Sequence, residues 1–370
     1  MKIAICIITY NRLESLKRVL ESINRAYIDQ EVTLIISIDK SETSIIEDFA
    51  DSYHWTYGDK RVIKHEKNLG LRKHVLSCGE LTKEYDALIV LEDDIVVAES
   101  FLTYTRQCVE KFKDDNNIAG ISLYNFPLSY HCRLPFHPLQ SDSDVFLMQC
   151  AQSWGQVWMP RQWAEFRKWY DENNEEFVEQ PHLPKSICSW PRSSWLKYHT
   201  KYCIENHKYF VYPYLSLTTN NSDAGTHVEN NDTLFQSFLR YGIKKEFNLQ
   251  PEVKYDSFFE NEMLCSVLGY SIDDLCVDFY GSKENREKKR YWLTREFLPY
   301  KVLKSYAIEY RPYELNIIYN NMGNELFLYD TSIPNDKRRI NNTKRFLTYI
   351  YEVSPKSIIK LWIKGILRHL

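Results

Sequence analysis

The stretch YDALIVLEDDIVVA at residues 85–98 carries the strongest fold signal, because an apolar run stops at three consecutive acids and then resumes. Residues 87–91 predict a strand buried on both faces. The acids Glu92, Asp93 and Asp94 repel one another and cannot be buried without partners. They form either a solvated turn or a site neutralised by a hard cation such as Mg²⁺ or Mn²⁺, with diphosphate oxygens completing it. Open α/β sheets bind ligands at the carboxyl ends of their strands, which favours the site.

Composition indicates a folded globular chain. With 370 residues, 44% hydrophobic and 26% charged, it can bury a large core and predicts one big domain with an appendage. A net charge of -3 and a pI near 6.4 give no case for a nucleic-acid partner. The aromatic content of 15% weakly favours a carbohydrate site. Nine cysteines without metal-ligand spacing predict buried apolar residues in a reducing compartment.

No targeting or membrane-spanning segment is evident in the sequence. Met1 and Lys2 lead directly into a strand-like run, without the pattern of a signal peptide. No run of about 18 apolar residues occurs. We therefore expect a cytoplasmic protein, soluble or peripheral at the inner face of the cytoplasmic membrane.

Strand and helix patterns alternate four times in the first hundred residues. The strand-like runs are 3–9, 32–38, 61–65 and 87–91, and helical spacing follows each of them. This alternation predicts an α/β fold with a mostly parallel, Rossmann-like sheet flanked by helices. Right-handed crossovers place the strand-to-helix turns along one edge, with Thr9, Arg12, Asp39, Asn68, Gly70, Arg72 and the acids 92–94. Neither GxGxxG nor a Walker lysine loop is present.

Four of these turns carry a resemblance. ITYNR at 8–12, ISID at 36–39, NLGL at 68–71 and LEDD at 91–94 resemble, in this order, the nucleotide-binding turns of GT-A glycosyltransferases. Bacterial family 2 enzymes are similar, as is the N-acetylglucosaminyltransferase I family, whose Glu-Asp-Asp motif is also followed by Val-Ala-x-x-Phe, here 97–101.

The resemblance implies roles for individual residues. Arg12 and Asp39 would contact the nucleotide base and its ribose or phosphates. Asp93 would contact the ribose, and Asp94 would hold a Mn²⁺ or Mg²⁺ ion that bridges the diphosphate. Glu92 would orient this turn. For each residue, a turn or capping role is the alternative.

Two later stretches extend the resemblance to bacterial family 2 enzymes. SWGQVWMPRQW at 153–163 is similar to their tryptophan-glycine turn, which implies that Trp154 and Gly155 lie under the donor sugar. Trp158 and Trp163 are predicted to belong to the core. The Gly-Thr-His turn ending at His227 implies a further metal ligand or diphosphate contact, since imidazole joins carboxylates around Mn²⁺. A structural histidine is the alternative.

The catalytic base is not identified by the sequence. At 189–195 the resembled families often carry an acid before a tryptophan, whereas here the sequence reads SWPRSSW. The acids that remain as candidates are Asp142, Asp144, Glu165, Glu179 and Asp223.

The expected domain division is a catalytic domain at 1–255 and a C-terminal extension at 256–370. Within the first, 1–125 would bind the nucleotide, and 126–255 would face the acceptor. In the second, 314–319 and 325–329 suggest a small hairpin. Residues 354–370 predict a basic amphipathic helix, either docked on an anionic membrane or packed on its own domain.

Together these features predict a metal-dependent glycosyltransferase, expected to be inverting. The donor would be a nucleotide sugar, expected to be UDP-linked and to carry a hexosyl or N-acetylhexosaminyl group. The acceptor would be a glycan or lipid-linked saccharide, in surface polysaccharide synthesis. A sugar nucleotidyltransferase is one alternative, although it usually needs a glycine-rich phosphate loop after the first strand. A non-catalytic scaffold of the same fold is the other.

Overall fold

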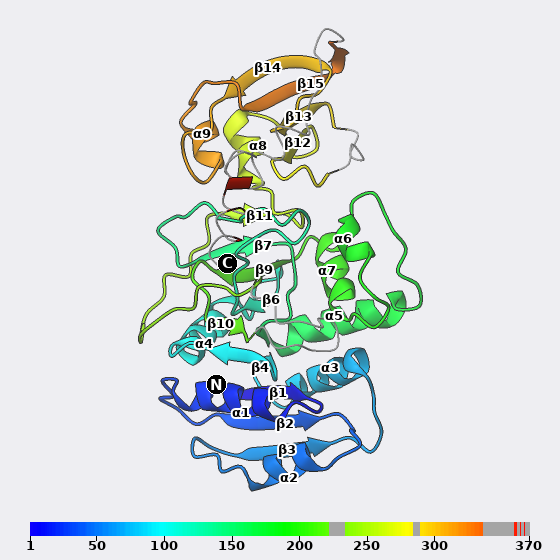
Figure 1. Cartoon of the computed structure of the whole chain (residues 1–370), viewed down its shortest axis with the longest axis vertical. Coiled ribbons are helices and arrows are strands. Elements are labelled where there is room, and N and C mark those ends of the chain that lie inside the picture. Colours follow the sequence, from blue (N-terminus) through cyan, green and yellow to red (C-terminus); the bar gives the residue numbers. More distant parts are fainter. Residues whose placement is uncertain (222–233, 284–288, 336–358, 361–362, 364–365, 367–370) are drawn as a thin grey trace. The chain divides into compact units, whose positions relative to one another are not determined.

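The computed structural model describes residues 1–221, 234–283, 289–335, 359–360, 363 and 366 (Figure 1). It divides into two compact units. Unit 1 comprises Met1–Pro127 and Pro138–Phe259, and unit 2 comprises Leu128–His137 together with the chain from Glu260 onward. Each unit has its own hydrophobic core.

Unit 1 is built on a nine-stranded sheet with the order β11-β7-β9-β6-β8-β4-β1-β2-β3. The strands are β1 (Ile3–Thr9), β2 (Thr33–Ile38), β3 (Lys60–Lys64), β4 (Ala87–Glu92), β6 (Ile118–Ser122), β7 (Val145–Met148), β8 (Gln156–Trp158), β9 (Tyr209–Pro213) and β11 (Lys254–Tyr255). β1 to β4 pair in parallel, as do β6 with β9 and β7 with β11. β8 is antiparallel to both neighbours, and β7 to β9. The predicted mostly parallel α/β sheet is confirmed.

The register of the sheet aligns the ends of its strands. Thr9 pairs with Ile38, and Ile8 pairs with Glu92, so β1, β2 and β4 end side by side. The short ladder of β5 (Ile95–Val97) and antiparallel β10 (Thr218–Asn220) continues directly beyond the end of β4. The turns after β1, β2 and β4 therefore share one edge, which is the geometry that the strand-helix alternation predicted.

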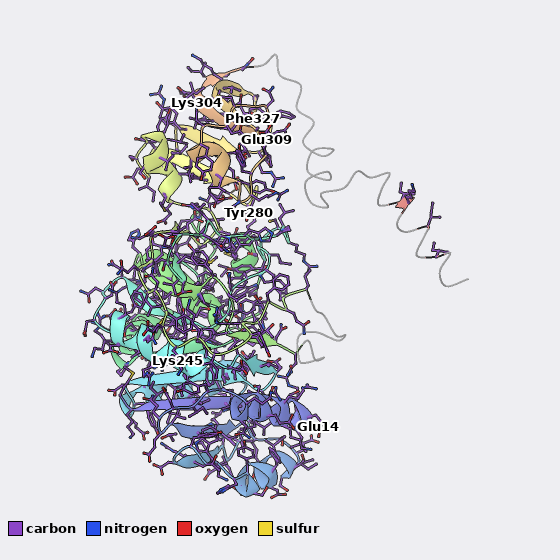
Figure 2. The ribbon with its side chains drawn as sticks, turned by 90° about the vertical axis from the view of Figure 1, so that its left-hand side faces the viewer. Glu14, Lys245, Tyr280, Lys304, Glu309 and Phe327 are labelled. Carbon is purple, nitrogen blue, oxygen red and sulfur yellow. The ribbon has the colours of Figure 1, made fainter. Side chains whose placement is uncertain are left out.

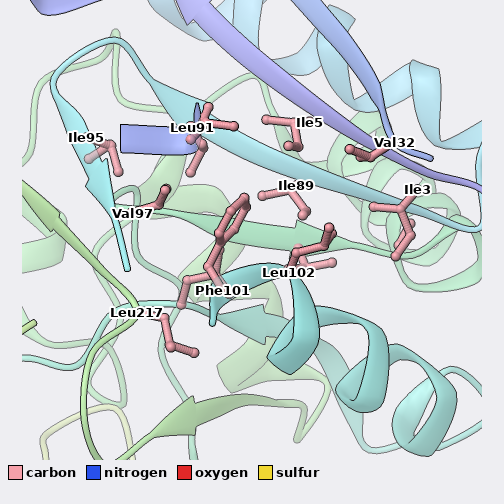
Figure 3. Close-up of a cluster of buried hydrophobic side chains, with 14 of the residues drawn as sticks. Ile3, Ile5, Val32, Ile89, Leu91, Ile95, Val97, Phe101, Leu102 and Leu217 are labelled. Carbon is pink, nitrogen blue, oxygen red and sulfur yellow. The ribbon is translucent and has the colours of Figure 1, made fainter. Parts of the chain in front are cut away.

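Helices cover both faces of this sheet. They are α1 (Leu13–Asn24), α2 (Ile45–Ser52), α3 (Leu71–Gly79), α4 (Phe101–Phe112), α5 (Pro160–Asn173), α6 (Lys185–Cys188) and α7 (Leu196–Glu205), with a 3₁₀ turn at Glu80–Lys83. Alternate residues of β1 and β4, such as Ile5 and Ile89, pack with Phe101 and Leu102 of α4 (Figure 3). The opposite faces of β1 and β4 meet Val75 of α3. This three-layer arrangement explains why the strands read as continuous apolar runs.

Unit 2 contains a four-stranded sheet in the order β12-β13-β15-β14. Its elements are β12 (Leu275–Asp278), β13 (Tyr291–Thr294), β14 (Tyr300–Tyr306) and β15 (Leu326–Pro334), with α8 (Met263–Leu268) and α9 (Glu314–Ile318). Figure 2 marks Lys304 of β14 and Phe327 of β15, two strands that pair antiparallel. One face of this sheet packs against the two helices.

The predicted hairpin of 314–319 with 325–329 is wrong. Residues 314–318 form helix α9, and β15 pairs instead with β13 and β14. The reason lies in Asn316, whose amide group donates to the carbonyls of Tyr310 and Tyr313 and accepts from the N–H of Glu309. A buried asparagine that bonds its own local backbone closes a compact turn rather than a strand.

The predicted C-terminal helix lies almost entirely outside the described residues. Ile359, Lys360, Ile363 and Ile366 are described, and all four are helical and exposed. Within the described parts of the chain, no helix combines the length and apolar character needed to cross a membrane.

Candidate functional site

The centre of the candidate site is an arginine held between two of the three predicted acids. The guanidinium of Arg12, which follows β1, pairs with Asp93 through Nη2 and with Asp94 through Nη1, the second contact being 3.2 Å long. The hydroxyl of Thr9 donates to the other oxygen of Asp93 at 2.8 Å. Asp93 is thus satisfied on both oxygens and buried, whereas the side chain of Asp94 keeps 22% of its surface exposed. Of these acids, Asp94 is the one available to a ligand.

The charges of this cluster are strongly coupled. Burial raises the pKa of the Asp93 carboxyl, while Arg12 and the Thr9 hydroxyl oppose that rise. Burial lowers the pKa of the Arg12 guanidinium, but the two aspartates outweigh this effect and raise it overall. The arginine therefore remains a cation beside the acids, at the edge where strands β1 and β4 end.

Glu92 points away from this pair and into the protein. It continues the face of β4 that carries Val90, and it lines a cavity of about 10 Å³ with Val75, Trp158 and Trp195. Such a volume holds about one water molecule. Burial, followed by the negative charges of Asp94 and Asp93, raises the pKa of Glu92 to about 8. A cation bound at Asp94 would offset that repulsion.

The turn after β2 is fixed by Asp39, which is 4% exposed. Its carboxylate accepts hydrogen bonds from the backbone N–H groups of Leu69 at 2.8 Å and Gly70 at 2.9 Å, and from that of Lys40 at 3.0 Å. Gly70 has a φ of +73°, which favours glycine at the start of α3. Three of the four lone-pair sites of Asp39 are therefore occupied by backbone. Asp39 positions the turn, and direct contact with a nucleotide stays a prediction.

Asn68 belongs to the same turn. Its amide donates to the carbonyl of Lys40 at 3.1 Å, and its side-chain oxygen accepts from the N–H of Gly70 at 3.0 Å. Thr9 is linked to the turn after β2 through the backbone, because the N–H of Asp39 donates to the Thr9 carbonyl at 3.0 Å. The turns after β1, β2 and β3 are thus joined by hydrogen bonds, and the structure brings Thr9, Asp39, Asn68 and Gly70 together.

The Trp154–Gly155 turn lies beside the end of β4, because β8 begins immediately after it. Gly155 has a φ of +103°, and a Cβ there would lie 2.8 Å from the Thr218 side chain. The Thr218 hydroxyl donates to the Trp154 carbonyl at 2.5 Å. The Trp154 ring stacks on Phe235 with centroids 5.4 Å apart. Trp158 and Trp163 are buried and stack on each other, which confirms their predicted place in the core.

Gln152 and Ser122 support this turn, and the sequence reasoning missed both. The amide of Gln152 donates to the Gly155 carbonyl at 2.6 Å and to the Ser122 hydroxyl at 2.8 Å. Both residues are buried. A usable signal was the glutamine inside the apolar run MQCAQSW at 148–154, since a buried amide requires partners.

Arg72 is engaged elsewhere. Its guanidinium donates to the Tyr170 hydroxyl at 2.6 Å and to the carbonyls of Asn174 and Arg192 at 3.1 and 3.2 Å. It also lies 4.3 Å from the centroid of the Tyr198 ring. The structure therefore does not bring Arg72 to the carboxylates. These contacts tie α3 to α5 and α7, which is a structural role.

The acids considered for the catalytic base are scattered. Glu165 is paired with Lys208 at 2.8 Å, and Asp144 with Lys244 at 2.5 Å. Asp142 is exposed on the loop before β7, and Glu179 lies between α5 and α6. Asp223 lies outside the described residues. Within the described part of the chain, no group of three or more histidine, cysteine or acidic side chains is arranged to hold a metal ion.

His227 also lies outside the described residues, but the point where its segment leaves the sheet is described. β10 ends at Asn220, and the backbone N–H of Asn221 donates to the Asp94 carbonyl at 2.7 Å. His227 follows six residues later, a length that spans up to about 20 Å when extended.

Comparison with known proteins gives one family match. Residues 4–156 match the family model described as glycosyl transferase family 2. This segment contains the turns after β1 to β4 and ends at the Trp154–Gly155 turn. A search of curated proteins found no match.

The solved structures that resemble the chain are distant. Residues 1–349 of TarS from S. aureus are 11% identical with a TM-score of 0.38, covering 60% of this chain and 61% of that one. The mannosyltransferase PcManGT from Pyrobaculum calidifontis, solved with GDP-Man and Mn²⁺, is 10% identical with a TM-score of 0.34, covering 58% and 57%. GalNAc-T7, solved with UDP, GalNAc and Mn²⁺, is 13% identical with a TM-score of 0.37, covering 58% and 42%. The chain thus spans about three fifths or less of each of them.

Residues 4–156, which match the family model of glycosyl transferase family 2, are also the residues that contain the connected turns after β1, β2, β3 and β4.

Proposed function

We propose that this protein transfers a sugar from a nucleotide-sugar donor, UDP-linked by preference, to a saccharide acceptor with the help of Mn²⁺ or Mg²⁺. The observation that supports this most strongly is the Arg12–Asp93–Asp94 cluster at the carboxyl end of β4. It combines a cation for phosphate with a partly exposed carboxylate for a metal, on the segment that matches family 2.

The donor set fits such a metal ion. Mg²⁺ and related ions are commonly bound through one or two carboxylates, with substrate phosphates and water supplying the remaining oxygens. Asp94 supplies an exposed carboxylate, and among the described residues only Arg12 donates to its side chain. His227 would add a ligand from the segment that follows Asn221. When bound, the metal would neutralise charge that develops on the departing diphosphate.

The remaining residues of the site would position the nucleotide and the donor sugar and would stabilise the diphosphate. Arg12 would turn from the aspartates toward the diphosphate, because a guanidinium binds phosphate oxygens in the same forked manner as carboxylates. Asp39 would hold the Asn68–Gly70 turn against the nucleotide, while Trp154 and Gly155 would form the floor under the donor sugar. Such fixed donors act without reorganising during the reaction.

We further propose an inverting displacement on a glycan or lipid-linked acceptor, as part of surface polysaccharide synthesis. A carboxylate would accept the proton of the attacking hydroxyl, and the sugar would pass to that oxygen as the diphosphate leaves. Asp142, Glu165, Glu179 and Asp223 remain the candidates for this base, whereas Asp144 precedes β7, four strands away from β4 in the sheet. Glu165 would have to leave its partner Lys208 to serve.

A titration of UDP and GDP with and without Mn²⁺, followed by an assay of donor hydrolysis, tests this function. A glycosyltransferase binds the diphosphate more tightly with Mn²⁺ and slowly hydrolyses its donor. A nucleotidyltransferase would instead form the sugar nucleotide from a nucleoside triphosphate and a sugar phosphate. A scaffold would show neither metal-dependent binding nor turnover.

Membrane contact is a separate proposal, supported by the pattern of residues 354–370. Lys356, Lys360, Lys364 and Arg368 recur every four residues, and Ile359, Ile363 and Ile366 are exposed. Each basic residue near an anionic leaflet contributes on the order of 1 kcal/mol. Deleting 354–370 is therefore expected to weaken sedimentation with anionic liposomes at low salt while sparing donor hydrolysis. Equal sedimentation of the full and shortened chains would contradict this proposal.

A further inference from the structure

Unit 1 contains a second pocket that the donor site does not use. Its volume is about 170 Å³, and its lining includes Ser141, Ser143, Asp144, Tyr214, Arg240 and Phe247. A cavity of about 150 Å³ is large enough for benzene. This pocket can therefore receive one six-membered ring, and its open side allows the ligand to continue into solvent.

The pocket lies at the same edge of the sheet as the carboxylates. Its wall is formed where β7 begins and β9 ends, and Val145 pairs there with Pro213. β9 is parallel to β6, and antiparallel β8 joins β6 to β4, so the end of β9 and the end of β4 face the same way. Four strand spacings separate β7 from β4, a distance of roughly 19 Å. Several linked sugar rings are needed to bridge it.

The charged side chains at the pocket leave an excess of positive charge. Asp144 is neutralised by Lys244 at 2.5 Å, and it also accepts from the N–H of Asn248 at 2.8 Å. Arg240 has no carboxylate partner among the described residues. Its Nε is buried and makes no hydrogen bond there.

A buried Nε–H group without an acceptor lowers the stability of the folded protein, because it loses its hydration and forms no hydrogen bond in exchange. The Arg240 guanidinium lies 6.0 Å from the centroid of the Phe247 ring, at the outer limit of a cation–π contact, and the Lys244 ammonium lies 5.2 Å from the same centroid. The planar guanidinium is suited to bidentate binding of a carboxylate or a phosphate.

We propose that this pocket binds an anionic sugar residue, one that carries a carboxylate or a phosphate, within the acceptor chain. Arg240 pairs with the anionic group, the Ser141 hydroxyl bonds a ring hydroxyl, and Phe247 contacts the apolar face of the ring. The bound residue is several rings away from the one that is extended at the donor site. Its identification as part of the acceptor rests on the proposed glycosyltransfer, whereas the binding of an anionic sugar does not.

Binding is measured without donor, by saturation-transfer NMR titration of the full chain with D-glucuronate, glucose 6-phosphate, glucose and inorganic phosphate. Charge-assisted hydrogen bonds make the anionic sugar that fits at least about tenfold tighter than glucose. Arg240→Gln removes that preference, and Arg240→Lys restores only part of it. Lys245→Gln is the matched control, because it removes an exposed positive charge (Figure 2) that lies five residues after Arg240 in the sequence. Lys245 does not belong to the pocket lining. Thermal unfolding of each variant verifies that it is folded.

The two anionic sugars distinguish the sources of the anion, since a carboxylate site prefers glucuronate and a phosphate site prefers glucose 6-phosphate. Glucose that binds as tightly as both, or a preference that survives Arg240→Gln, overturns the proposal. Inorganic phosphate that binds as tightly as glucose 6-phosphate also overturns it, because the site would then recognise an anion and no sugar. UDP titration of the same samples reads the donor site separately. Failure of UDP binding alone therefore refutes the proposed function and leaves this pocket assignment standing.

Discussion

Replacing Glu92 by glutamine should make the stability of unit 1 less sensitive to a rise in pH from 4.5 to 8. The pKa of Glu92 is raised from its ordinary value of 4.5 to about 8 by burial and by its two acidic neighbours. Between these values the folded state holds a proton that the unfolded state has lost, so the free energy of unfolding falls as pH rises from 4.5 to 8. The Glu92→Gln variant lacks this proton equilibrium.

The size of the expected change in unfolding free energy follows from the pKa shift of Glu92. At 1.36 kcal/mol for each pKa unit, the full difference corresponds to an upper bound of about 5 kcal/mol. The measurement covers only the upper part of this window, from about pH 6 to 8, and the partial exposure of the Glu92 side chain screens its charge. We therefore expect the free energy of unfolding of the variant, relative to the wild type, to increase by about 1–3 kcal/mol across that range.

Urea unfolding followed by tryptophan fluorescence measures this difference, because Trp158 and Trp195 line the same cavity as Glu92. Glu110→Gln is the control, since it removes an exposed carboxyl of α4 in the same unit. The free energy of unfolding of this control, plotted against pH, should run parallel to that of the wild type. If the free energy of unfolding of Glu92→Gln also runs parallel to that of the wild type, Glu92 ionises like an ordinary surface acid, and the argument that burial and the neighbouring acids raise its pKa is refuted.

Three further substitutions probe other parts of the site. Asp94→Asn should abolish the dependence of UDP binding on Mn²⁺ and leave the thermal midpoint unchanged or higher, and metal dependence that persists would exclude Asp94 as the ligand. Gly155→Ala should lower the free energy of unfolding, measured by urea titration, by about 1–3 kcal/mol. This loss should exceed that of Gly242→Ala, because Gly242 also has a positive φ but has open space around it. Equal losses of unfolding free energy in the two variants would mean that the contact with Thr218 costs nothing. Arg72→Lys should lower the thermal midpoint while UDP affinity changes less than about twofold, and a large affinity loss at an unchanged midpoint would restore Arg72 to the donor site.

The sequence predicted the parts of this site that depend on local pattern. Continuous apolar runs gave the buried strands, and the positions of Thr9, Asp39 and Asn68 after them gave the shared edge. The acids 92–94 lie at the carboxyl end of β4, as expected from the point where the apolar run stops.

What the sequence could not predict depends on which partner each side chain finds in the folded chain. Arg72 follows the same pattern as Arg12, but Tyr170 and Tyr198 from distant helices engage it. Glu92 differs from Asp94 because it is the last residue of β4 and shares the face of Val90, which Trp158 and Trp195 cover, whereas Asp94 lies in the turn that follows the strand. The helix at 314–318 depends on hydrogen bonds of Asn316 that no periodicity encodes.

Calorimetric titration of the full chain with UDP, with and without Mn²⁺, tests the proposed donor site most directly. Wild-type protein should bind UDP at least about tenfold more tightly with Mn²⁺, since a bridging cation adds charge-assisted contacts to the diphosphate. Asp86→Asn, at the opposite end of β4, should behave like the wild type, because the Asp86 carboxylate accepts only from the backbone N–H of Lys2 among the described residues. Asp94→Asn should bind UDP no more tightly with Mn²⁺ than without it. UDP affinity that is the same with and without Mn²⁺ in the wild type would contradict a metal-dependent donor site at the end of β4.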